Sequence, residues 1–406
     1  MTSSLQNHQS GQKRIIFVSG EMELGGAAMF VMNICESLRE TGSGWQGIAG
    51  VFSDLKEIGI QMRNRTLPVT GPFTGRLIHE EYIEALHGEC QRLKPEAIVA
   101  NLGGNAFDFL RFVPKSVLRV AMIHSDDESV YQQVTKYLPW IDLIVGVSAH
   151  NCEVMRERLS GSNKPIRQVA CGVPMPEPTS RKIRHHGPLR ILYLGRVVEE
   201  QKRASFLARV IRETLETGLE VTWTIAGDGS ELPSLREIFA NNGDQVQFLG
   251  ALDYAEVPAL LTEQDVYFLC SDFEGLPLSL LEAMGAGCVP VVSDLPSGIS
   301  EVVNEDNGIR VPISEVGGYV AALADLCGNR QRLAAMATAA AQTVLENYST
   351  AAMAHRWTNV LEEHAKTSPP DWSKPCVADA PPACRIHWYF HPHLRCLRKI
   401  AKLVRG

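Results

Sequence analysis

Two carboxylates, Glu274 and Glu282, are separated by seven residues in the segment Glu-Gly-Leu-Pro-Leu-Ser-Leu-Leu-Glu. The run before them, 265–270, is short, apolar and rich in aromatic residues, which predicts a buried strand. A glycine and a proline then break the chain before a predicted helix opens at Ser279. The pair therefore lies where a parallel strand ends and a helix begins. In open α/β sheets ligands bind at this edge, and helix N–H groups there attract anions.

The same residues also allow a purely structural interpretation. Ser279 and Glu282 stand in the S-x-x-E relation of a capping box, in which each side chain satisfies a backbone N–H of the other residue. Glu274 lies in the loop with no such local partner in the sequence, but an exposed loop carboxylate is usually only solvated. A ligand site and a helix cap therefore both remain open.

Two cations follow the predicted strand 189–194. Arg196 precedes Lys202 by six residues, so both side chains can project from one loop toward a shared anion. An arginine offers a fixed fork of donors and a lysine a mobile point charge, a combination suited to a diphosphate. The alternative is that these cations pair with the neighbouring Glu199 and Glu200.

Glycines mark two further strand ends. Gly25 and Gly26 follow a predicted strand at 14–19 and precede a predicted helix at 27–39. Glycines at such a position allow close approach of the backbone to a phosphate, although the full G-x-G-x-x-G pattern is absent. The Gly-Asp-Gly run 227–229 closes a later strand and is more typical of a turn.

His124 ends another apolar run and is followed by Ser125, Asp126 and Asp127. A histidine at a strand tip beside carboxylates can serve as a general base, as a hydrogen-bond partner of a sugar hydroxyl, or as a satisfied core residue. Its position alone favours the core.

Short apolar strands and helical stretches alternate twice along the chain, which predicts an α/β protein with two Rossmann-like, doubly wound domains that face a cleft, plus a C-terminal extension. The predicted strands are 14–19, 96–100, 118–123 and 143–148 in the first set, and 189–194, 221–226, 246–249, 265–270 and 289–292 in the second. The predicted division is a flexible N-terminus at 1–13, a first domain at 14–174, a linker at 175–188, a second domain at 189–345, a closing helix at 346–366, and a Pro-rich linker with a basic tail at 367–406.

Composition excludes several classes. The chain has 406 residues, 45% of them hydrophobic, which suffices for full cores. A net charge of −7 argues against a nucleic-acid partner. Apolar runs are shorter than the roughly 18 residues of a membrane span, and the polar start is unlike a secretory signal. The ten cysteines form no C-x-x-C pair, which is typical of reduced core residues in a cytoplasmic protein.

Together these features resemble the retaining, nucleotide-sugar-dependent glycosyltransferases of the GT-B fold, family four, over roughly residues 14–364. The matching second-half pieces are Gly195-Arg196 with Lys202, Ala-Gly-Asp-Gly at 226–229, Phe-Leu-Gly at 248–250, the run 272–292, and Asn307-Gly308 before Val311-Pro312. The first-half pieces are Gly25-Gly26-Ala27, His124, the run 142–148, and Cys-Gly-Val-Pro at 171–174, where the family commonly has Asn-Gly-Val-Asp. That departure affects the interdomain loop.

The resemblance implies a role for each matched residue. Arg196 and Lys202 would hold the donor diphosphate, with backbone donors added at Leu278 and Ser279. Glu282 would accept hydrogen bonds from the donor ribose. The catalytic pair would be Glu274 and His124, both contacting the transferred sugar from opposite domains, while Gly25 and Gly26 would leave room for the diphosphate and the acceptor.

The resemblance also implies a mechanism and a set of substrates. The donor would be a UDP- or GDP-sugar, and the acceptor a glycan or a lipid-linked glycan of a cell-surface polysaccharide. No metal cofactor is expected, because cations and helix amides would stabilise the charge that grows on the leaving diphosphate. Front-face attack, in which the leaving phosphate oxygen takes the acceptor proton, is favoured, and no nucleophile is named. Domain closure would exclude water.

The last residues, 385–406, carry six positive charges and no Asp or Glu. Apolar and basic side chains separate onto two helical faces, and a basic amphipathic helix of this kind can lie on an anionic membrane surface. This favours a cytoplasmic protein that is peripheral on the membrane. The alternatives are a helix packed back on the catalytic body, or a zinc cluster at His387, His391, His393 and Cys396, whose spacing matches no standard site.

Other classes remain open as alternatives: a GT-B nucleotide-sugar epimerase, a phosphorylase, or a non-catalytic partner protein. The first two do not typically combine the 274–282 carboxylates with Arg196 and Lys202. A non-catalytic protein would be expected to have lost one of these groups, and all are present. The sequence does not indicate the donor base, the sugar, the acceptor or the linkage.

Overall fold

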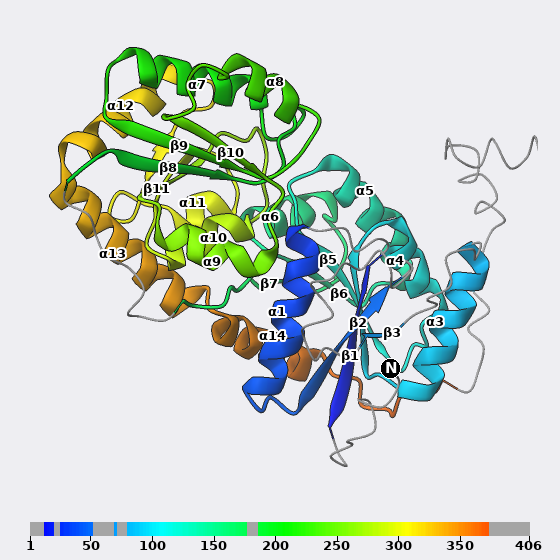
Figure 1. Cartoon of the computed structure of the whole chain (residues 1–406). Coiled ribbons are helices and arrows are strands. Elements are labelled where there is room, and N and C mark those ends of the chain that lie inside the picture. Colours follow the sequence, from blue (N-terminus) through cyan, green and yellow to red (C-terminus); the bar gives the residue numbers. More distant parts are fainter. Residues whose placement is uncertain (1–11, 20–24, 52–68, 71–78, 177–185, 373–406) are drawn as a thin grey trace, which may run out of the picture.

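The computed structural model describes residues 12–19, 25–51, 69–70, 79–176 and 186–372. They form two lobes, each a parallel sheet with helices packed against it (Figure 1). The prediction of an α/β protein with two doubly wound domains is therefore confirmed.

The first sheet has seven strands in the order β3-β2-β1-β4-β5-β6-β7. Its strands are β1 (Lys13–Ser19), β2 (Trp45–Val51), β3 (Val69–Thr70), β4 (Ala97–Leu102), β5 (Leu118–Ile123), β6 (Leu143–Gly146) and β7 (Ile166–Gln168). Every residue of β5 is buried, as expected for a strand covered on both faces. The chain order reverses beside β1, which pairs in parallel with both β2 and β4. Carboxyl strand ends at such a switch point open a crevice for ligands.

The second sheet has six strands in the order β10-β9-β8-β11-β12-β13. Its strands are β8 (Leu189–Leu194), β9 (Val221–Ala226), β10 (Val246–Gly250), β11 (Val266–Leu269), β12 (Val289–Ser293) and β13 (Ile309–Val311). Here the order reverses beside β8, which pairs in parallel with β9 and β11. The loops that leave β8 and β11 are therefore neighbours at one edge of the sheet.

Helices cover both faces of each sheet. In the first domain they are α1 (Gly26–Glu40), α3 (His79–Leu93), α4 (Gly104–Phe109), α5 (Glu128–Tyr137) and α6 (Ala149–Arg158). In the second they are α7 (Ala204–Glu216), α8 (Leu232–Ile238), α9 (Val257–Thr262), α10 (Leu278–Gly285), α11 (Gly298–Val302), α12 (Val316–Gly328) and α13 (Arg330–Asn347). Short 3-10 turns lie at η2 (Leu110–Phe112), η3 (Leu138–Trp140) and η4 (Tyr254–Glu256).

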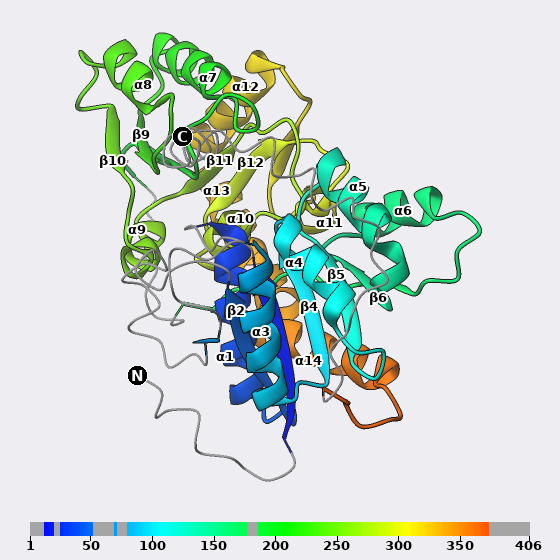
Figure 2. The ribbon, with the colours of Figure 1, turned by 90° about the vertical axis from the view of Figure 1, so that its right-hand side faces the viewer.

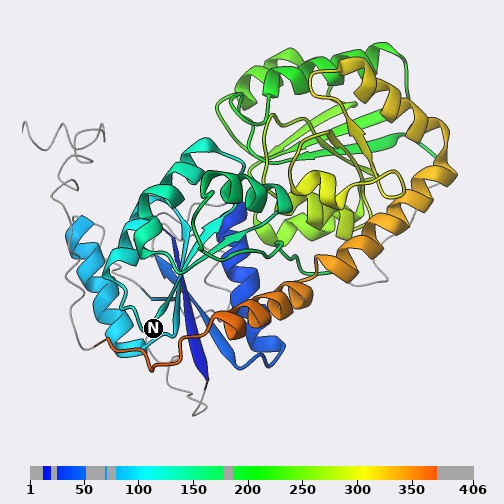
Figure 3. The same cartoon turned by 180° about the vertical axis from the view of Figure 1, so that it is seen from behind.

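A last helix, α14 (Thr350–His364), returns from the second domain to the first, as Figure 3 shows. It packs against α1, and its Trp357 is fully buried with its ring 5.4 Å from that of Phe17. At the crossing, Val173 N donates to Tyr348 O and Thr350 N donates to Val173 O, so the two passes of chain between the domains are hydrogen-bonded to each other.

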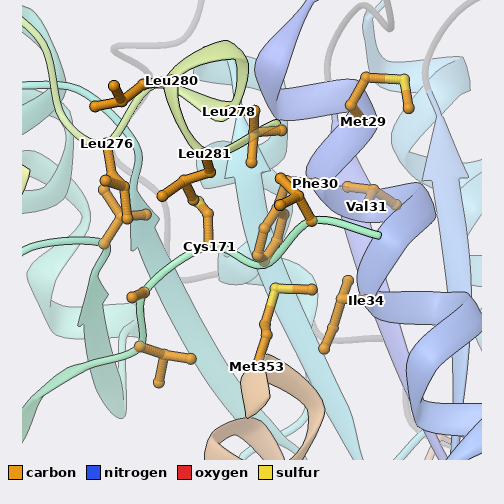
Figure 4. Packing of buried hydrophobic residues seen from close by; sticks show 14 of the residues in the cluster. Met29, Phe30, Val31, Ile34, Cys171, Leu276, Leu278, Leu280, Leu281 and Met353 are labelled. Carbon is orange, nitrogen blue, oxygen red and sulfur yellow. The ribbon is translucent and has the colours of Figure 1, made fainter. Parts of the chain in front are cut away.

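One hydrophobic core spans the domain boundary. Side chains of α1, including Phe30 and Ile34, belong to the same buried cluster as Leu278 and Leu281 of α10 (Figure 4). Figure 2 shows α10 and α11 on the side of the second domain that lies next to the first, and α11 also contacts α6. The domains therefore meet through packed apolar side chains.

The described chain ends in a docked segment after α14. Trp372 is 3% exposed, and its indole Nε1 donates to Pro95 O at 3.2 Å. Gln91 donates to the backbone oxygen of Trp372, and Asp371 N donates to Ser116 Oγ. Pro95 and Ser116 precede β4 and β5, so this segment lies at the amino ends of the first sheet, away from its carboxyl edge.

Candidate functional site

The loops after β8 and β11 meet in a buried ion pair. Lys202 Nζ donates to Glu274 Oε1 at 2.5 Å, and the two side chains are only 11% and 8% exposed. Glu199 instead accepts hydrogen bonds from the backbone and hydroxyl of Ser205. The predicted alternative of a Lys202 pair with Glu199 or Glu200 is therefore wrong. The neighbouring strands β8 and β11 bring together a cation and a carboxylate that lie 72 positions apart in the chain.

Arg196 lies at the exposed rim of the same site. Its guanidinium donates to Gln201 Oε1 at 2.8 Å, and Gln201 Nε2 donates to the carbonyl of Phe273 at 3.1 Å. Gln201 therefore links the Arg196 loop to the Glu274 loop. Sequence reasoning missed Gln201, although its place directly before Lys202 was visible.

Two glycines of the 227–229 turn support the Arg196 loop. A Cβ on Gly227 would lie 1.8 Å from Gly195 O, and one on Gly229 would lie 2.2 Å from Val197 O. Both glycines also have positive φ angles, 132° and 158°. The turn is thus a close backbone contact that holds Arg196 in place.

The helix after Glu274 begins one residue earlier than predicted. Helix α10 starts at Leu278 with Pro277 as its N-cap, and no side chain caps it. The predicted capping box is therefore wrong. Ser279 Oγ lies 2.8 Å from the hydroxyl of Tyr267, whose pKa is raised by burial, and Glu282 Oε1 accepts from the hydroxyl of Tyr254 at 2.9 Å.

This start leaves backbone donors at the site. Leu278, Ser279 and Leu280 form the first turn of α10, so their backbone N–H groups have no carbonyl acceptor within the helix. Pro277, the N-cap, carries no N–H of its own. Leu278 itself is buried, so its side chain packs in the interdomain core while its backbone forms the helix end. A helix N-terminus of this kind suits an anionic oxygen.

His124 lies directly after β5 and is half-buried rather than part of the core. Its Nε2 is 2.7 Å from Asn101 Oδ1, and its ring packs against that of Phe30 in a T-shaped arrangement with the ring centroids 4.9 Å apart. Burial lowers the pKa of His124 to about 4. The imidazole is therefore neutral at pH 7.

The two domains touch at His124 and Gly275. A Cβ on Gly275 would lie 2.0 Å from the carbonyl oxygen of His124, so only glycine fits there. The same Gly275 accepts a hydrogen bond from Gly298 N at 2.7 Å. The backbone next to Glu274 is thereby held against the backbone of His124, which brings the two predicted catalytic residues to one place.

A second polar contact joins the domains beside it. Glu301 of α11 accepts from Ala149 N, at the start of α6, at 2.6 Å and from Gln168 Nε2 at 2.5 Å. A carboxylate at the first turn of a helix is favourable because it faces the positive end of the helix dipole. Glu301 therefore caps a helix of the opposite domain.

Gly25 and Gly26 form the exposed start of α1. A Cβ added to Gly26 would meet nothing within 4 Å among the described residues, so the structure shows open space there rather than a tight contact. The neighbouring residues 20–24 lie outside the described residues.

The described part of the chain contains neither a metal-binding cluster nor a membrane-spanning helix. Its His, Cys, Asp and Glu side chains form no group of three or more that could hold a metal ion. None of its helices has the length and apolarity required to cross a bilayer. The predicted zinc alternative and the basic tail at 385–406 both lie outside the described residues.

Two parallel-sheet domains, with cations and an uncapped helix at the inner edge of the second, define a protein of the GT-B class. Residues 188–329 match the family model described as Glycosyl transferases group 1. Over these residues the chain is similar to the group 1 glycosyl transferases, and the chain as a whole has the GT-B fold.

Several curated glycosyltransferases are similar to this chain. The chain is 26% identical over 291 residues to the putative colanic acid biosynthesis glycosyltransferase WcaL of Salmonella typhimurium, covering 66% of this chain and 70% of WcaL. It is 31% identical over 230 residues to the O-antigen biosynthesis glycosyltransferase WbnH of Escherichia coli, covering 55% and 62%. The match to the GtfA subunit of a Streptococcus pneumoniae UDP-N-acetylglucosamine–peptide N-acetylglucosaminyltransferase, 29% identical over 43% of this chain, spans only 36% of that subunit.

Solved structures share the fold at low identity. Anabaena HepE in complex with UDP-glucose superposes with a TM-score of 0.71 at 16% identity, covering 86% of this chain and 99% of HepE. TarM of S. aureus gives a TM-score of 0.70 at 12% identity, with 86% and 98% covered. At such identities the likeness shows the fold alone.

Proposed function

We propose that this protein is a retaining glycosyltransferase that moves a sugar from a UDP- or GDP-sugar to a glycan or lipid-linked glycan during synthesis of a cell-surface polysaccharide. The observation that carries the proposal is the convergence of Lys202, Glu274, Arg196 and the uncapped start of α10 at one sheet edge. WcaL and WbnH, named for polysaccharide biosynthesis, support the class of product.

In this proposal the second domain binds the donor diphosphate. Lys202 has three N–H donors, so it can keep one on Glu274 and direct the others to phosphate oxygens. Arg196 at the exposed rim adds a planar fork, and the N–H groups of Leu278 and Ser279 add backbone donors. Glu282, held by Tyr254, accepts from the ribose hydroxyls. Gly25 and Gly26 border the diphosphate from the first domain.

The chemistry follows from these contacts. The acceptor hydroxyl oxygen bonds to the anomeric carbon on the face from which the diphosphate leaves, while the bond from that carbon to the phosphate oxygen breaks. The acceptor proton passes to the departing phosphate oxygen, so no protein nucleophile is needed. Cations and helix amides stabilise the negative charge on the leaving group without a metal ion. Glu274 and His124 position the sugar hydroxyls and stabilise the positive charge near the anomeric carbon.

A thermal-shift screen tests the donor assignment. The purified full chain is heated with UDP, GDP, ADP and their common sugar conjugates, with and without magnesium. A nucleotide at 100 times its dissociation constant adds about 2.7 kcal/mol to the free energy of unfolding. Stabilisation by one nucleotide series, equal with and without magnesium, supports the proposal. No stabilisation by any nucleotide, together with no turnover, favours a non-catalytic partner protein.

We also propose that the basic sequence 385–406 places the enzyme on the cytoplasmic face of the membrane. The support is its six positive charges without an acidic residue. A truncation that tests this should end after Trp372, because this side chain is buried in the first domain. Its removal alone would lower the free energy of unfolding by about 3 kcal/mol. A chain ending at 372 should keep activity on soluble substrates and lose binding to phosphatidylglycerol vesicles. Equal vesicle binding by the truncated and full chains overturns the membrane assignment.

A further inference from the structure

Asn101 lies on the central strand β4 at the carboxyl, or inner, edge of the first sheet. It is 1% exposed, near the end of β4, and its side chain reaches the ends of two neighbouring strands and the first turn of α1. Its Nδ2 is 3.1 Å from Ser19 Oγ and 3.4 Å from Ala27 O, and its Oδ1 is 2.7 Å from His124 Nε2.

These contacts fix which end of the Asn101 amide faces His124. Ala27 O is a carbonyl oxygen and can only accept, so the amide nitrogen must point toward it. The amide oxygen then points to His124 Nε2. Because that oxygen can only accept, Nε2 must carry the proton, and in a neutral ring the lone pair is left on Nδ1.

The surroundings of His124 keep the ring neutral. The ring of Phe30 packs against the imidazole, and the backbone of Gly275 lies against the histidine carbonyl. The nearest carboxylate along the chain, Asp126, is engaged by the hydroxyl of Tyr131 at 2.7 Å and by His150 Nε2 at 3.2 Å. Burial lowers the pKa of His124 for the same reason. Within the described ranges no group donates a hydrogen bond to Nδ1, so this atom is free to accept one from a ligand.

We propose that Asn101 is a positioning residue that presents Nδ1 of His124 as a hydrogen-bond acceptor to a hydroxyl of the transferred sugar. The inference rests on the proposed function. The contact of Gly275 with the His124 carbonyl brings the loop that carries Glu274 against the end of β5, and an ionised carboxylate likewise only accepts hydrogen bonds. The donor sugar must therefore offer hydroxyl hydrogens to both domains, and a sugar with fluorine at the position facing His124 is a poor donor.

The first test reads the proton position directly and needs no substrate. Imidazole nitrogen resonances of the uniformly ¹⁵N-labelled full chain are recorded at pH 7, and His124 is assigned by its loss in His124→Gln. The expected result is a neutral ring protonated on Nε2. In Asn101→Asp, a carboxylate beside Nε2 raises the pKa of His124, so a larger imidazolium fraction is expected at pH 7. A wild-type ring protonated on Nδ1, or on both nitrogens, overturns the proposal and leaves the proposed function intact.

The second test asks whether the acceptor atom is used. Release of UDP or GDP is followed with UDP-glucose, UDP-N-acetylglucosamine and GDP-mannose, and variants are compared on the best donor. Asn101→Ala should lower kcat/KM by about tenfold, the usual effect of losing one hydrogen bond in a buried site. At pH 8 the kcat/KM of Asn101→Asp should match that of the wild type, and it should fall as the pH is lowered to 6, since the imidazolium form has no lone pair on Nδ1. The matched control is Asn241→Ala, an exposed asparagine of the second domain that should keep wild-type turnover.

The outcomes separate the two hypotheses. Unchanged kcat/KM in Asn101→Ala, with an active wild type, overturns only the role of Asn101. A wild type that neither binds nor turns over any nucleotide sugar overturns the proposed function and this inference together. Loss of activity in Asn101→Ala that Asn101→Asp restores fully at pH 8 but not at pH 6 supports the role of Asn101 through His124.

Discussion

The inner edges of the two sheets carry different chemistry. The edge of the second sheet is ionic, with a buried Lys202–Glu274 pair, an arginine at the rim and a helix start without a cap. The edge of the first sheet is neutral: Asn101, Ser19 and an uncharged His124 form a hydrogen-bonded chain. Charge suits a diphosphate and neutral acceptors suit sugar hydroxyls, so under the proposed function the two halves of a nucleotide sugar are bound by different domains.

The largest expected effect comes from breaking the ionic edge. Glu274→Gln should abolish transfer and retain nucleotide binding, whereas Lys202→Ala should weaken both. Lys202→Ala also leaves a buried carboxylate without its partner, at a cost of about 3–5 kcal/mol, which urea unfolding measures. Near-normal turnover by Glu274→Gln would show that the loop carboxylate has been misassigned.

A double variant separates stability from function at this pair. Replacing both residues with apolar groups of similar size, Lys202→Met with Glu274→Leu, should restore most of the stability, because no unpaired charge stays buried. It should remain inactive. Recovery of turnover together with stability would mean that the pair is only structural.

The next effect comes from separating the two edges. Gly275→Ala places a Cβ where the His124 carbonyl lies, so the domains must move apart or the loop must shift. Turnover should fall about 100-fold if reacting groups move by about 1 Å, while nucleotide affinity changes less. Crystallography or small-angle scattering can detect the displacement, and Gly243→Ala, at a glycine with open space around it, is the matched control. Wild-type turnover in Gly275→Ala would show that the contact between the edges is not required.

A smaller effect is expected at the rim. Arg196→Ala should raise the dissociation constant of UDP or GDP by about tenfold, because an exposed charge contributes less than a buried one. Titration at 50 mM and 500 mM salt should show a weaker salt dependence for the variant. The unfolding free energy should stay unchanged, since within the described region the exposed Arg196 guanidinium bonds only to the side chain of Gln201. Equal salt dependence would place the diphosphate elsewhere.

The smallest effect concerns pH and belongs to the neutral edge. The pKa of His124 is lowered from about 6.5 to about 4 in the folded protein, so the unfolded chain binds the extra proton first as pH falls. The contribution of His124 to stability is therefore complete above about pH 6.5 and is lost progressively toward pH 4. Urea midpoints of wild type and His124→Gln are measured from pH 7.5 to 4.5. The difference between the two midpoints should become smaller as the pH falls. A constant difference between them would show that His124 does not titrate differently in the two states.

Strand positions were predictable where apolar runs end at turn residues. The predicted strands 118–123, 189–194 and 221–226 match β5, β8 and β9 residue for residue. Strand β2 was missed because its two glycines hide the pattern, although Gly47 is needed there: a Cβ would lie 2.7 Å from Cys35. Ser148, placed in a strand by its apolar neighbours, instead caps α6 through its side chain.

The site was predictable only in part. Sequence order located the residues that leave β8 and β11, but not that Lys202 pairs with Glu274, since this depends on which strands are neighbours in the sheet. The capping box failed because Pro277 starts the helix early and Tyr267, from the strand beneath, takes the hydroxyl of Ser279. The role of Asn101 could not be predicted from the sequence, because its hydrogen-bond partners come from three other segments of the chain.

The return of α14 to the first domain has a consequence for engineering. The second domain is an insertion, entered and left by two passes of chain that bond to each other at Val173 and Thr350. A chimaera that exchanges donor specificity therefore needs two junctions, one beside Val173 and one beside Ser349, and must keep α14 from the recipient. A single crossover between the domains would pack α1 against a helix from the other protein. The side chains around Trp357, including Phe17, would then no longer match the residue that packs against them.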